Sequence, residues 1–277
     1  MPRVDLDLDL GDAAGSLLVT ARDGVVTVVL SRPERHNAIN LAMWLALPPL
    51  MAALEAHPDV DVVVFRGPPG GPFSAGADIS ESTTLRRDPA DAARYGQAVA
   101  AGEGAVTAYA GPTVAMVEGF AIGGGTQLAL ACDLRVCEPG ARFGITPAKL
   151  GIVYGLASTA RLVDVVGRAW ASWILLTGDL LDAETAVRIG LVNEVTTDLE
   201  ARTAQLAATL ASRARVSLRG GKALIGKVAD GVRSEDEEVH EHYRASLHGP
   251  EYAEGVEAFL AKRPPDFRAA RTPRAAE

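Results

Sequence analysis

The sequence predicts an α/β fold built from stacked ββα units. Val-rich apolar runs at residues 60–66 and 112–117 have the length and composition of buried strands. Each run ends in glycines, and the second leads into helix formers at residues 126–131. Strand and helix patterns continue to alternate to about residue 200, although the sequence shows no clear internal repeat.

The spacing of hydrophobic residues indicates which segments form helices and which form strands. Glycines and prolines mark where these segments end. The strand-like segments are 17–20, 25–30, 60–66, 112–117, 134–137 and 191–195, and a further segment begins at 141–144. The helix-like segments are 40–56, 89–109, 126–131, 158–166, 169–177, 182–189 and most of the chain from about 200 onward.

Particular residues justify several of these elements. Asp23-Gly24 favours a tight hairpin turn between the first two strands. Asn40 suits the N-cap of the first helix. Pro48 and Pro49 lie inside that helix, and because proline removes a helix hydrogen bond we expect a bent helix or two short ones. Gly167 separates two later helices.

The composition is that of an ordinary globular protein. The chain has 277 residues, 48% hydrophobic and 22% charged, with a formal net charge of −8, so it lacks the basic footprint of a nucleic-acid binder. No apolar run is long enough for a membrane span, and residues 1–9 do not resemble a signal peptide. Cys132 and Cys137 are expected to be buried thiols of a cytoplasmic protein.

The chain is organised around residues 112–133, which read PTVAMVEGFAIGGGTQLALACD. Gly123, Gly124 and Gly125 stand at the start of an apolar helix. Glycines admit a ligand close to the backbone, and a helix N-terminus offers free N–H groups, so this stretch suits an oxygen that becomes negative during a reaction. The simple alternative is a tight strand-to-helix turn without a ligand. The pattern is neither G-x-G-x-x-G nor a P-loop.

A second glycine motif, F-S-A-G-A-D-I at residues 73–79, follows another buried strand about fifty residues earlier. The pair of motifs, in this order and spacing, resembles the enoyl-CoA hydratase/isomerase family, the crotonase superfamily. The resemblance extends from Arg32 to Phe267. It implies the crotonase fold, a spiral of ββα units with a C-terminal helical region that forms trimers. It also implies that the N–H groups of Ala75 and Gly124 form an oxyanion hole for a CoA thioester carbonyl.

The family's two catalytic glutamates are missing. The positions that align with them hold Gln127 and Pro147, and neither residue is an acid or a base. This departure leaves ordinary hydration without its acid–base groups. Another carboxylate could substitute, and the candidates are Glu103, Glu118 and Asp78.

The segment 143–154, FGITPAKLGIVY, resembles methylmalonyl-CoA decarboxylases of the same superfamily. Their tyrosine helps to hold the substrate carboxylate, a role that falls on Tyr154; a core tyrosine is the alternative. Loss of CO₂ yields the enolate without a base, and Gln127 and Thr146 could hydrogen-bond a carboxylate without repelling it. These decarboxylases carry a histidine where this chain has Ala77, which leaves substrate orientation less explained.

The resemblance also implies where CoA binds. The adenosine and phosphate end is expected near residues 35–38 and the backbone at Asp78 and Ile79, with Phe259 and Lys262 reaching the CoA of a neighbouring subunit. The residues assigned to CoA binding are Arg35, Ala38, Asp78, Ile79, Phe259 and Lys262. Surface or core roles are the alternatives for each of them.

These observations lead to one functional hypothesis and two alternatives. The main hypothesis is a decarboxylase of malonyl-type thioesters that acts through an enolate; the alternatives are a hydratase or double-bond isomerase with an unusual acid–base group, and a catalytically silent acyl-CoA binder. We expect residues 1–15 to form a loose tail, 16–200 the core and 201–277 a helical region. We also expect a trimer or hexamer, a CoA or carrier-bound substrate, and no metal, nicotinamide or flavin. The five histidines form no metal-ligand pattern.

Overall fold

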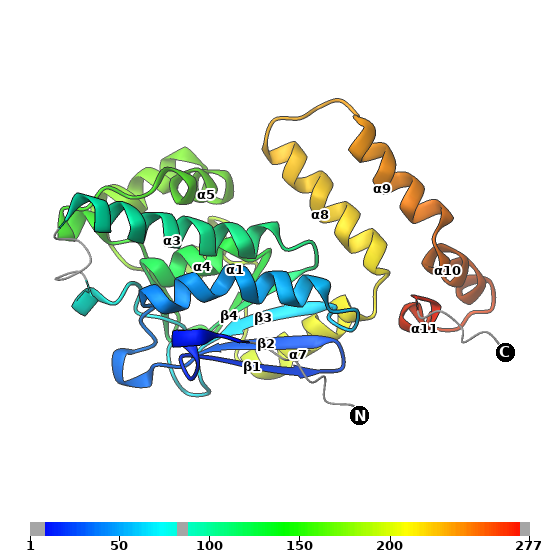
Figure 1. Ribbon diagram of the computed structural model, residues 1–277, viewed down its shortest axis with the longest axis horizontal. Coiled ribbons are helices and arrows are strands. Elements are labelled where there is room, and N and C mark those ends of the chain that lie inside the picture. Colours follow the sequence, from blue (N-terminus) through cyan, green and yellow to red (C-terminus); the bar gives the residue numbers. More distant parts are fainter. Residues whose placement is uncertain (1–8, 82–87, 272–277) are drawn as a thin grey trace.

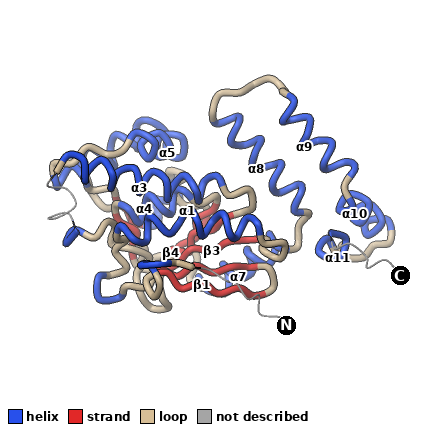
Figure 2. The backbone as a smooth tube through the Cα atoms, in the orientation of Figure 1, coloured by secondary structure: helices blue, strands red, loops and turns tan. Residues whose placement is uncertain are grey.

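The computed structural model describes residues 9–81 and 88–271, which form a twisted sheet covered by helices and a helical C-terminal arm (Figure 1). Six strands pair in the order β1-β2-β3-β4-β6-β9; β1 and β2 are antiparallel, and the later pairs are parallel. Their bounds are Leu17–Arg22, Val25–Leu30, Val62–Arg66, Thr113–Val117, Leu134–Cys137 and Glu194–Val195. Figure 2 shows these strands gathered below the main group of helices.

The hairpin between β1 and β2 forms where the sequence predicts it. Asp23 and Gly24 have φ values of 52° and 83°. Two left-handed residues give the turn a twist that matches the twist of the strands, which is why Asp-Gly is favoured there.

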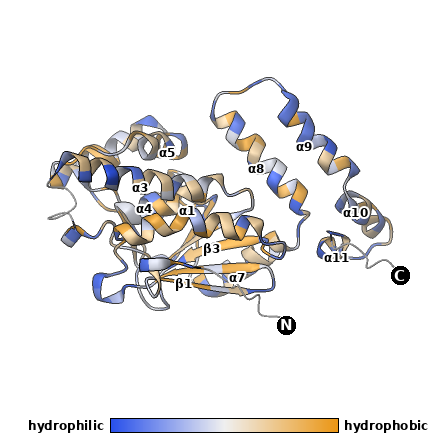
Figure 3. Ribbon diagram, viewed as in Figure 1, coloured by the Kyte–Doolittle hydropathy of each residue, from blue (hydrophilic) through white to orange (hydrophobic). Residues whose placement is uncertain are grey.

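Alternate residues of the central strands feed two hydrophobic layers. Val63 and Phe65 of β3 join the core beneath helix α1 (Leu41–Ala56) and helix α3 (Pro89–Ala108). Val62 and Val64 pack on the opposite face against helix α7 (Leu199–Ala211). A parallel sheet that is buried on both faces explains the unbroken apolar runs in its strands, which are mostly orange in Figure 3.

Helix α1 begins as predicted, and of the two expected forms, a bent helix or two short ones, the structure excludes the second. The Asn40 side chain accepts a hydrogen bond of 2.9 Å from the Met43 N–H, the geometry of an N-cap. The helix is nevertheless continuous through Pro48 and Pro49. Seven of its residues are buried against the core, and this packing holds together a helix that lacks two internal hydrogen bonds.

A smaller sheet and two further helices complete the core. Strands β5 (Phe120–Ile122), β7 (Arg142–Gly144) and β8 (Leu181–Asp182) pair in that order. Helix α5 (Leu156–Thr177) is interrupted at Gly167, whose φ of 71° and ψ of 163° are not helical, so the predicted pair of helices is confirmed. Helix α6 (Ala183–Arg188) follows β8. Both cysteine thiols are free and buried, as predicted.

The C-terminal region is helical, as predicted, up to residue 271. Helices α8 (Arg215–Ala229), α9 (Glu237–His248), α10 (Pro250–Leu260) and α11 (Phe267–Arg271) form an arm beside the core (Figure 1). Asp61, at the start of β3, ties the arm to the core: its buried carboxylate receives hydrogen bonds from Arg215, Arg268 and Arg271.

The two ends of the chain lie partly outside the described residues. Of the tail predicted over residues 1–15, residues 1–8 lie outside, while Gly11–Ala13 form a short 3₁₀ helix with Ala13 buried. Residues 272–277 of the predicted helical region also lie outside. In the described part of the chain, no helix is long and apolar enough to cross a membrane.

Candidate active site

Two loops that leave neighbouring parallel strands bring the glycine motifs together. β3 and β4 are adjacent, so their carboxyl ends open at the same edge of the sheet. An isolated bridge between Ser74 and Ala121 joins the loops, with the Ser74 N–H donating to Phe120 O and the Ile122 N–H donating to Ser74 O, each at 3.0 Å. The motif at 73–79 therefore lies against the start of helix α4 (Gly124–Ala131).

Two backbone N–H groups lie side by side at this junction. Gly123 has a φ of 50°, which turns the chain into α4 and leaves the Gly124 N–H in the first turn without a capping side chain. The Ala77 N–H lies beside it: a Cβ added to Gly124 would be 3.3 Å from the Ala77 nitrogen. Neither N–H has a hydrogen-bond partner among the described residues. This pair has the form of an oxyanion hole.

The structure corrects the assignment of Ala75. Its N–H donates to His36 O at 3.0 Å and is not available to a ligand. The bridge between Ile39 and Ala77 instead uses Gly76 O and the Asp78 N–H, which leaves the Ala77 N–H to point the other way. In an extended chain, residues two apart point their N–H groups to the same side, so the sequence pattern could not distinguish Ala75 from Ala77. The φ of 100° at Gly76 breaks this alternation, and the two N–H groups point to different sides.

A cavity of about 360 Å³ opens above this pair of N–H groups. One wall is helix α3, which presents Tyr95 and four smaller residues to the cavity: Ala92, Gly96, Val99 and Ala100. The remaining lining is Trp44, Ala77, Gly124, Gln127 and the segment 152–158. Helix α3 therefore borders the cavity along part of its length. The largely apolar wall suits an acyl chain.

Behind the cavity, four side chains form a hydrogen-bonded chain. The Gln127 Nε2 donates to Ser158 Oγ at 2.9 Å, and Ser158 Oγ donates to Glu103 Oε2 at 2.8 Å. Arg161 donates to the same carboxylate oxygen at 2.8 Å. Gln127 and Ser158 line the cavity, and Glu103 is only 1% exposed. Burial raises the pKa of Glu103, against the lowering effects of Ser158 and Arg161.

Sequence reasoning did not find Ser158. It lies 55 residues from Glu103 and 31 from Gln127, and no local pattern connects the three. Of the three carboxylates named as substitutes, Glu103 is the one joined to the cavity. Asp78 is bound to Arg32 at 2.8 Å, and Glu118 accepts from the Gly70 N–H at 3.2 Å.

Tyr154 lines the cavity, and its hydroxyl is buried without a hydrogen-bond partner among the described residues. Burial raises the pKa of Tyr154 well above its ordinary value, and the charge of Glu103 raises it further. The tyrosine is therefore a neutral donor close enough to feel the Glu103 carboxylate. Thr146 and Pro147 do not line this cavity; Thr146 precedes a short 3₁₀ helix, Pro147–Leu150.

The residues assigned to the adenosine end of CoA lie near the first motif. Arg35 and Ile79 are exposed, while Ala38 and Asp78 are buried. The Asp78 carboxylate is already occupied by Arg32 and by the Ser80 hydroxyl, at 2.8 and 2.6 Å. Burial acts to raise the pKa of Asp78, but these partners hold it below its usual value.

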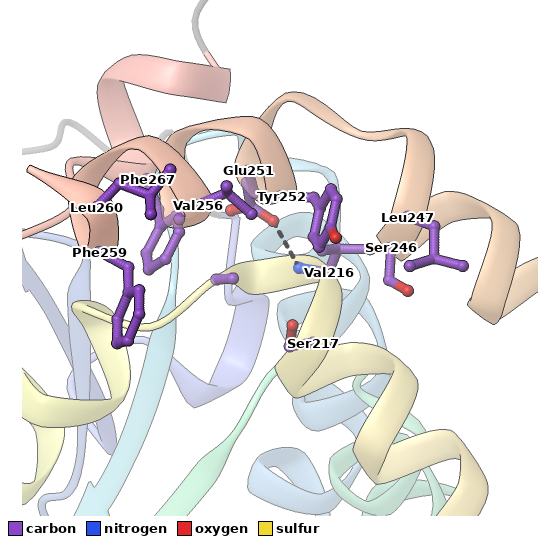
Figure 4. Close-up of a pocket in the computed structure, with 12 residues that line it drawn as sticks. Val216, Ser217, Ser246, Leu247, Glu251, Tyr252, Val256, Phe259, Leu260 and Phe267 are labelled. Carbon is purple, nitrogen blue, oxygen red and sulfur yellow. Dashed lines mark hydrogen bonds between the residues drawn. The ribbon is translucent and has the colours of Figure 1, made fainter.

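Phe259 lies away from this cavity, in the C-terminal arm. It lines a second hollow of about 580 Å³ between α8, α9, α10 and α11 (Figure 4). Glu251 closes one side of this hollow by accepting a hydrogen bond of 2.8 Å from the Val216 N–H. Phe259 is 83% exposed, and Lys262 follows the end of α10. Within one chain, neither residue is brought to the Gly124 site.

Comparisons with known proteins identify the family of this chain. The family model for enoyl-CoA hydratase/isomerase matches residues 20–270. The chain is 32% identical over 256 residues to a probable enoyl-CoA hydratase of Mycobacterium leprae, and 30% identical over 256 residues to a crotonyl-CoA hydratase of Syntrophomonas wolfei; each alignment covers 91% of this chain and 97% of the relative.

Solved structures show the same fold. One is an enoyl-CoA hydratase/carnithine racemase from Magnetospirillum magneticum, with a TM-score of 0.87 and 35% identity over 91% of this chain and 95% of that one. Another is an enoyl-CoA hydratase from Bacillus anthracis, with a TM-score of 0.84 and 27% identity over 91% and 99% of the two chains. The predicted crotonase fold is therefore confirmed, and the chain belongs to the enoyl-CoA hydratase/isomerase family.

Proposed function

We propose that this enzyme transfers protons on an enoyl-CoA thioester, adding water across its double bond or moving that bond, through an enolate. The observation that carries the proposal is the pair of N–H groups of Ala77 and Gly124 at the base of an apolar cavity. Two donors aimed at a thioester oxygen stabilise the charge that develops there.

Hydration and double-bond migration fit the surroundings better than decarboxylation. Both reactions need an acid–base group, and Glu103 stands behind the cavity in contact with Ser158. Glu103 also acts electrostatically on Tyr154, so a substrate carboxylate placed at Tyr154 would meet a negative neighbour whenever Glu103 is ionised. The relatives named as hydratases point in the same direction.

Decarboxylation of a malonyl-type thioester is the second candidate. The Tyr154 hydroxyl favours it, because this buried donor lines the cavity and has no partner among the described residues. A substrate carboxylate could accept that hydrogen bond, and the enolate would form in the same oxyanion hole without a base.

Product analysis of the purified protein separates these candidates. The protein is incubated separately with crotonyl-CoA, vinylacetyl-CoA and methylmalonyl-CoA, and the products are identified by chromatography and mass spectrometry. We expect crotonyl-CoA to gain one water, or vinylacetyl-CoA to become crotonyl-CoA. Loss of CO₂ from methylmalonyl-CoA alone would establish the second candidate. Binding of all three without turnover would favour a silent acyl-CoA binder.

A further inference from the structure

Glu103 is a buried carboxylate with only half of its hydrogen-bonding capacity used. Its Oε2 accepts from Ser158 and Arg161, but its Oε1 is buried and has no hydrogen-bond partner among the described residues. An unpaired oxygen would destabilise an ion pair that had only a structural role, because an unsatisfied buried acceptor is costly. An unsatisfied buried group in a native structure calls for an explanation, and a catalytic role is one such explanation.

Ser158 connects this carboxylate to the space where substrate would lie. The serine lines the cavity, donates its only hydroxyl proton to Glu103 and accepts one hydrogen bond from Gln127. Gln127 occupies one of the two lone pairs of the hydroxyl and Glu103 accepts its proton, so the direction of the hydroxyl is fixed and its second lone pair is left to accept a proton. A hydroxyl held in this way can take up a proton from one side while it releases its own to the other.

We propose that Ser158 and Glu103 form a proton relay, in which the serine contacts the reacting atoms and the glutamate stores the proton. The relay rests on the proposed function and names the acid–base group that it requires. Gln127 acts as a positioning residue that orients the serine.

The atoms balance for hydration. The water oxygen bonds to Cβ of the enoyl group, and its proton passes to Ser158 Oγ while the serine proton passes to Glu103 Oε2. The electrons of the double bond move onto the thioester oxygen, next to the N–H groups of Ala77 and Gly124. The stored proton then returns through Ser158 to Cα as the enolate collapses. The net change is one water added, and no other reactant is needed.

Two other titratable groups act on Glu103 or respond to it in the described part of the chain. Arg161, on α5, favours the ionised carboxylate, and Tyr154, on the loop before α5, feels its charge. Burial has the largest effect on Glu103 and raises its pKa above the ordinary glutamate value. As the pH falls through this raised pKa, the carboxylate becomes protonated and the relay loses its base.

The test compares Ser158→Ala, Glu103→Gln and Ser158→Thr with the wild type, on crotonyl-CoA and vinylacetyl-CoA. We expect Ser158→Ala and Glu103→Gln to lower kcat by about 10²-fold or more with KM changed only a few-fold, and to abolish the acidic limb of the pH–rate profile. Ser158→Thr keeps the hydroxyl and should restore much of the rate. Thr159→Ala removes the neighbouring hydroxyl, which bonds to Gly155 O instead, and serves as the matched control.

Each outcome bears on a different claim. A wild-type enzyme that turns over either thioester, with an acidic limb that survives in Ser158→Ala and Glu103→Gln, would overturn the relay and leave the proposed function standing. A wild-type enzyme inactive on both thioesters would overturn the proposed function and the relay with it. Ser158→Ala leaves Gln127 and Glu103 each short of one buried hydrogen bond, so its melting temperature should fall below that of Thr159→Ala. A circular dichroism spectrum equal to that of the wild type at the assay temperature separates lost chemistry from lost folding.

Discussion

Adding one methyl group at Gly124 should close the oxyanion hole. The Cβ of Gly124→Ala would stand 3.3 Å from the Ala77 nitrogen and 3.3 Å from Trp44 Cζ2. An enolate oxygen that accepts from both N–H groups must lie about 2.9 Å from each nitrogen, in the space beside that methyl group. The oxygen and the methyl group would compete for the same volume.

The magnitude follows from the number of donors affected. Loss of one oxyanion donor typically costs about 10²–10³ in kcat, or about 2.7–4 kcal/mol of transition-state stabilisation. Because the methyl group moves the oxygen away from both donors, we expect a fall of at least about 10²-fold. The effect should appear in kcat more than in KM, since the charge develops only in the transition state.

The assay is steady-state turnover of the thioester that the wild type accepts. Gly104→Ala is the matched control: it makes the same chemical change in α3, outside the cavity lining, where a Cβ would meet nothing within 4 Å. Circular dichroism and melting temperature establish that both variants fold. A folded Gly124→Ala enzyme with kcat within about 3-fold of the wild type would refute the assignment of the oxyanion hole.

Three further predictions concern stability and assembly. Gly102→Ala should destabilise the protein by about 1–3 kcal/mol in chemical unfolding, because its Cβ would approach Trp44 to 2.8 Å. Gly104→Ala, whose Cβ meets nothing within 4 Å, should stabilise it by up to about 1 kcal/mol. Equal effects of the two substitutions would contradict the close packing of α1 and α3. Asp61→Asn should cost about 3–5 kcal/mol at neutral pH, because it leaves the three arginines without their shared carboxylate. Phe259→Asp should reduce the molecular mass measured by light scattering if the exposed arm forms the expected trimer; an unchanged mass would place the interface elsewhere.

The pH dependence of the Asp61 contribution has a definite sign. Burial acts to raise the pKa of Asp61, but hydrogen bonds from Arg268 and Arg215 and the charge of Arg271 outweigh it, so the folded pKa lies below the ordinary value of 3.8. The stabilisation is therefore complete above the unfolded pKa and is lost as the pH falls through the folded pKa. Acid unfolding curves of Asp61→Asn should be flatter below about pH 4 than those of the wild type.

Local features of the fold were predictable because their causes are local. The turn at Asp23-Gly24 and the cap at Asn40 depend on a few neighbouring atoms, and both form as expected. Whether the helix would divide at Pro48 and Pro49 was not predictable, because the burial that holds it together comes from distant parts of the chain. The alternative of two short helices followed from the local cost of proline without that packing.

The sequence predicted which motifs form the site, but not which atoms of those motifs face the cavity. Motif spacing pointed to the Gly124 N–H, which has no partner among the described residues. The second unpaired N–H belongs to Ala77 and not to Ala75, because the backbone angle at Gly76 turns the chain between them. Glu103 was named as a candidate base. Its link to the cavity depends on Ser158, a contact between helices far apart in sequence that no pattern reveals.

Exchange of the α-protons of butyryl-CoA in D₂O tests the central claim most directly. This saturated thioester cannot be hydrated, isomerised or decarboxylated, so deuterium at Cα reports only that the site forms an enolate and returns a proton to it. The account predicts exchange by the wild type and near-background exchange by Gly124→Ala and Ser158→Ala. Absence of exchange in a wild-type protein that binds butyryl-CoA would contradict the account, because no acid–base group would then reach Cα.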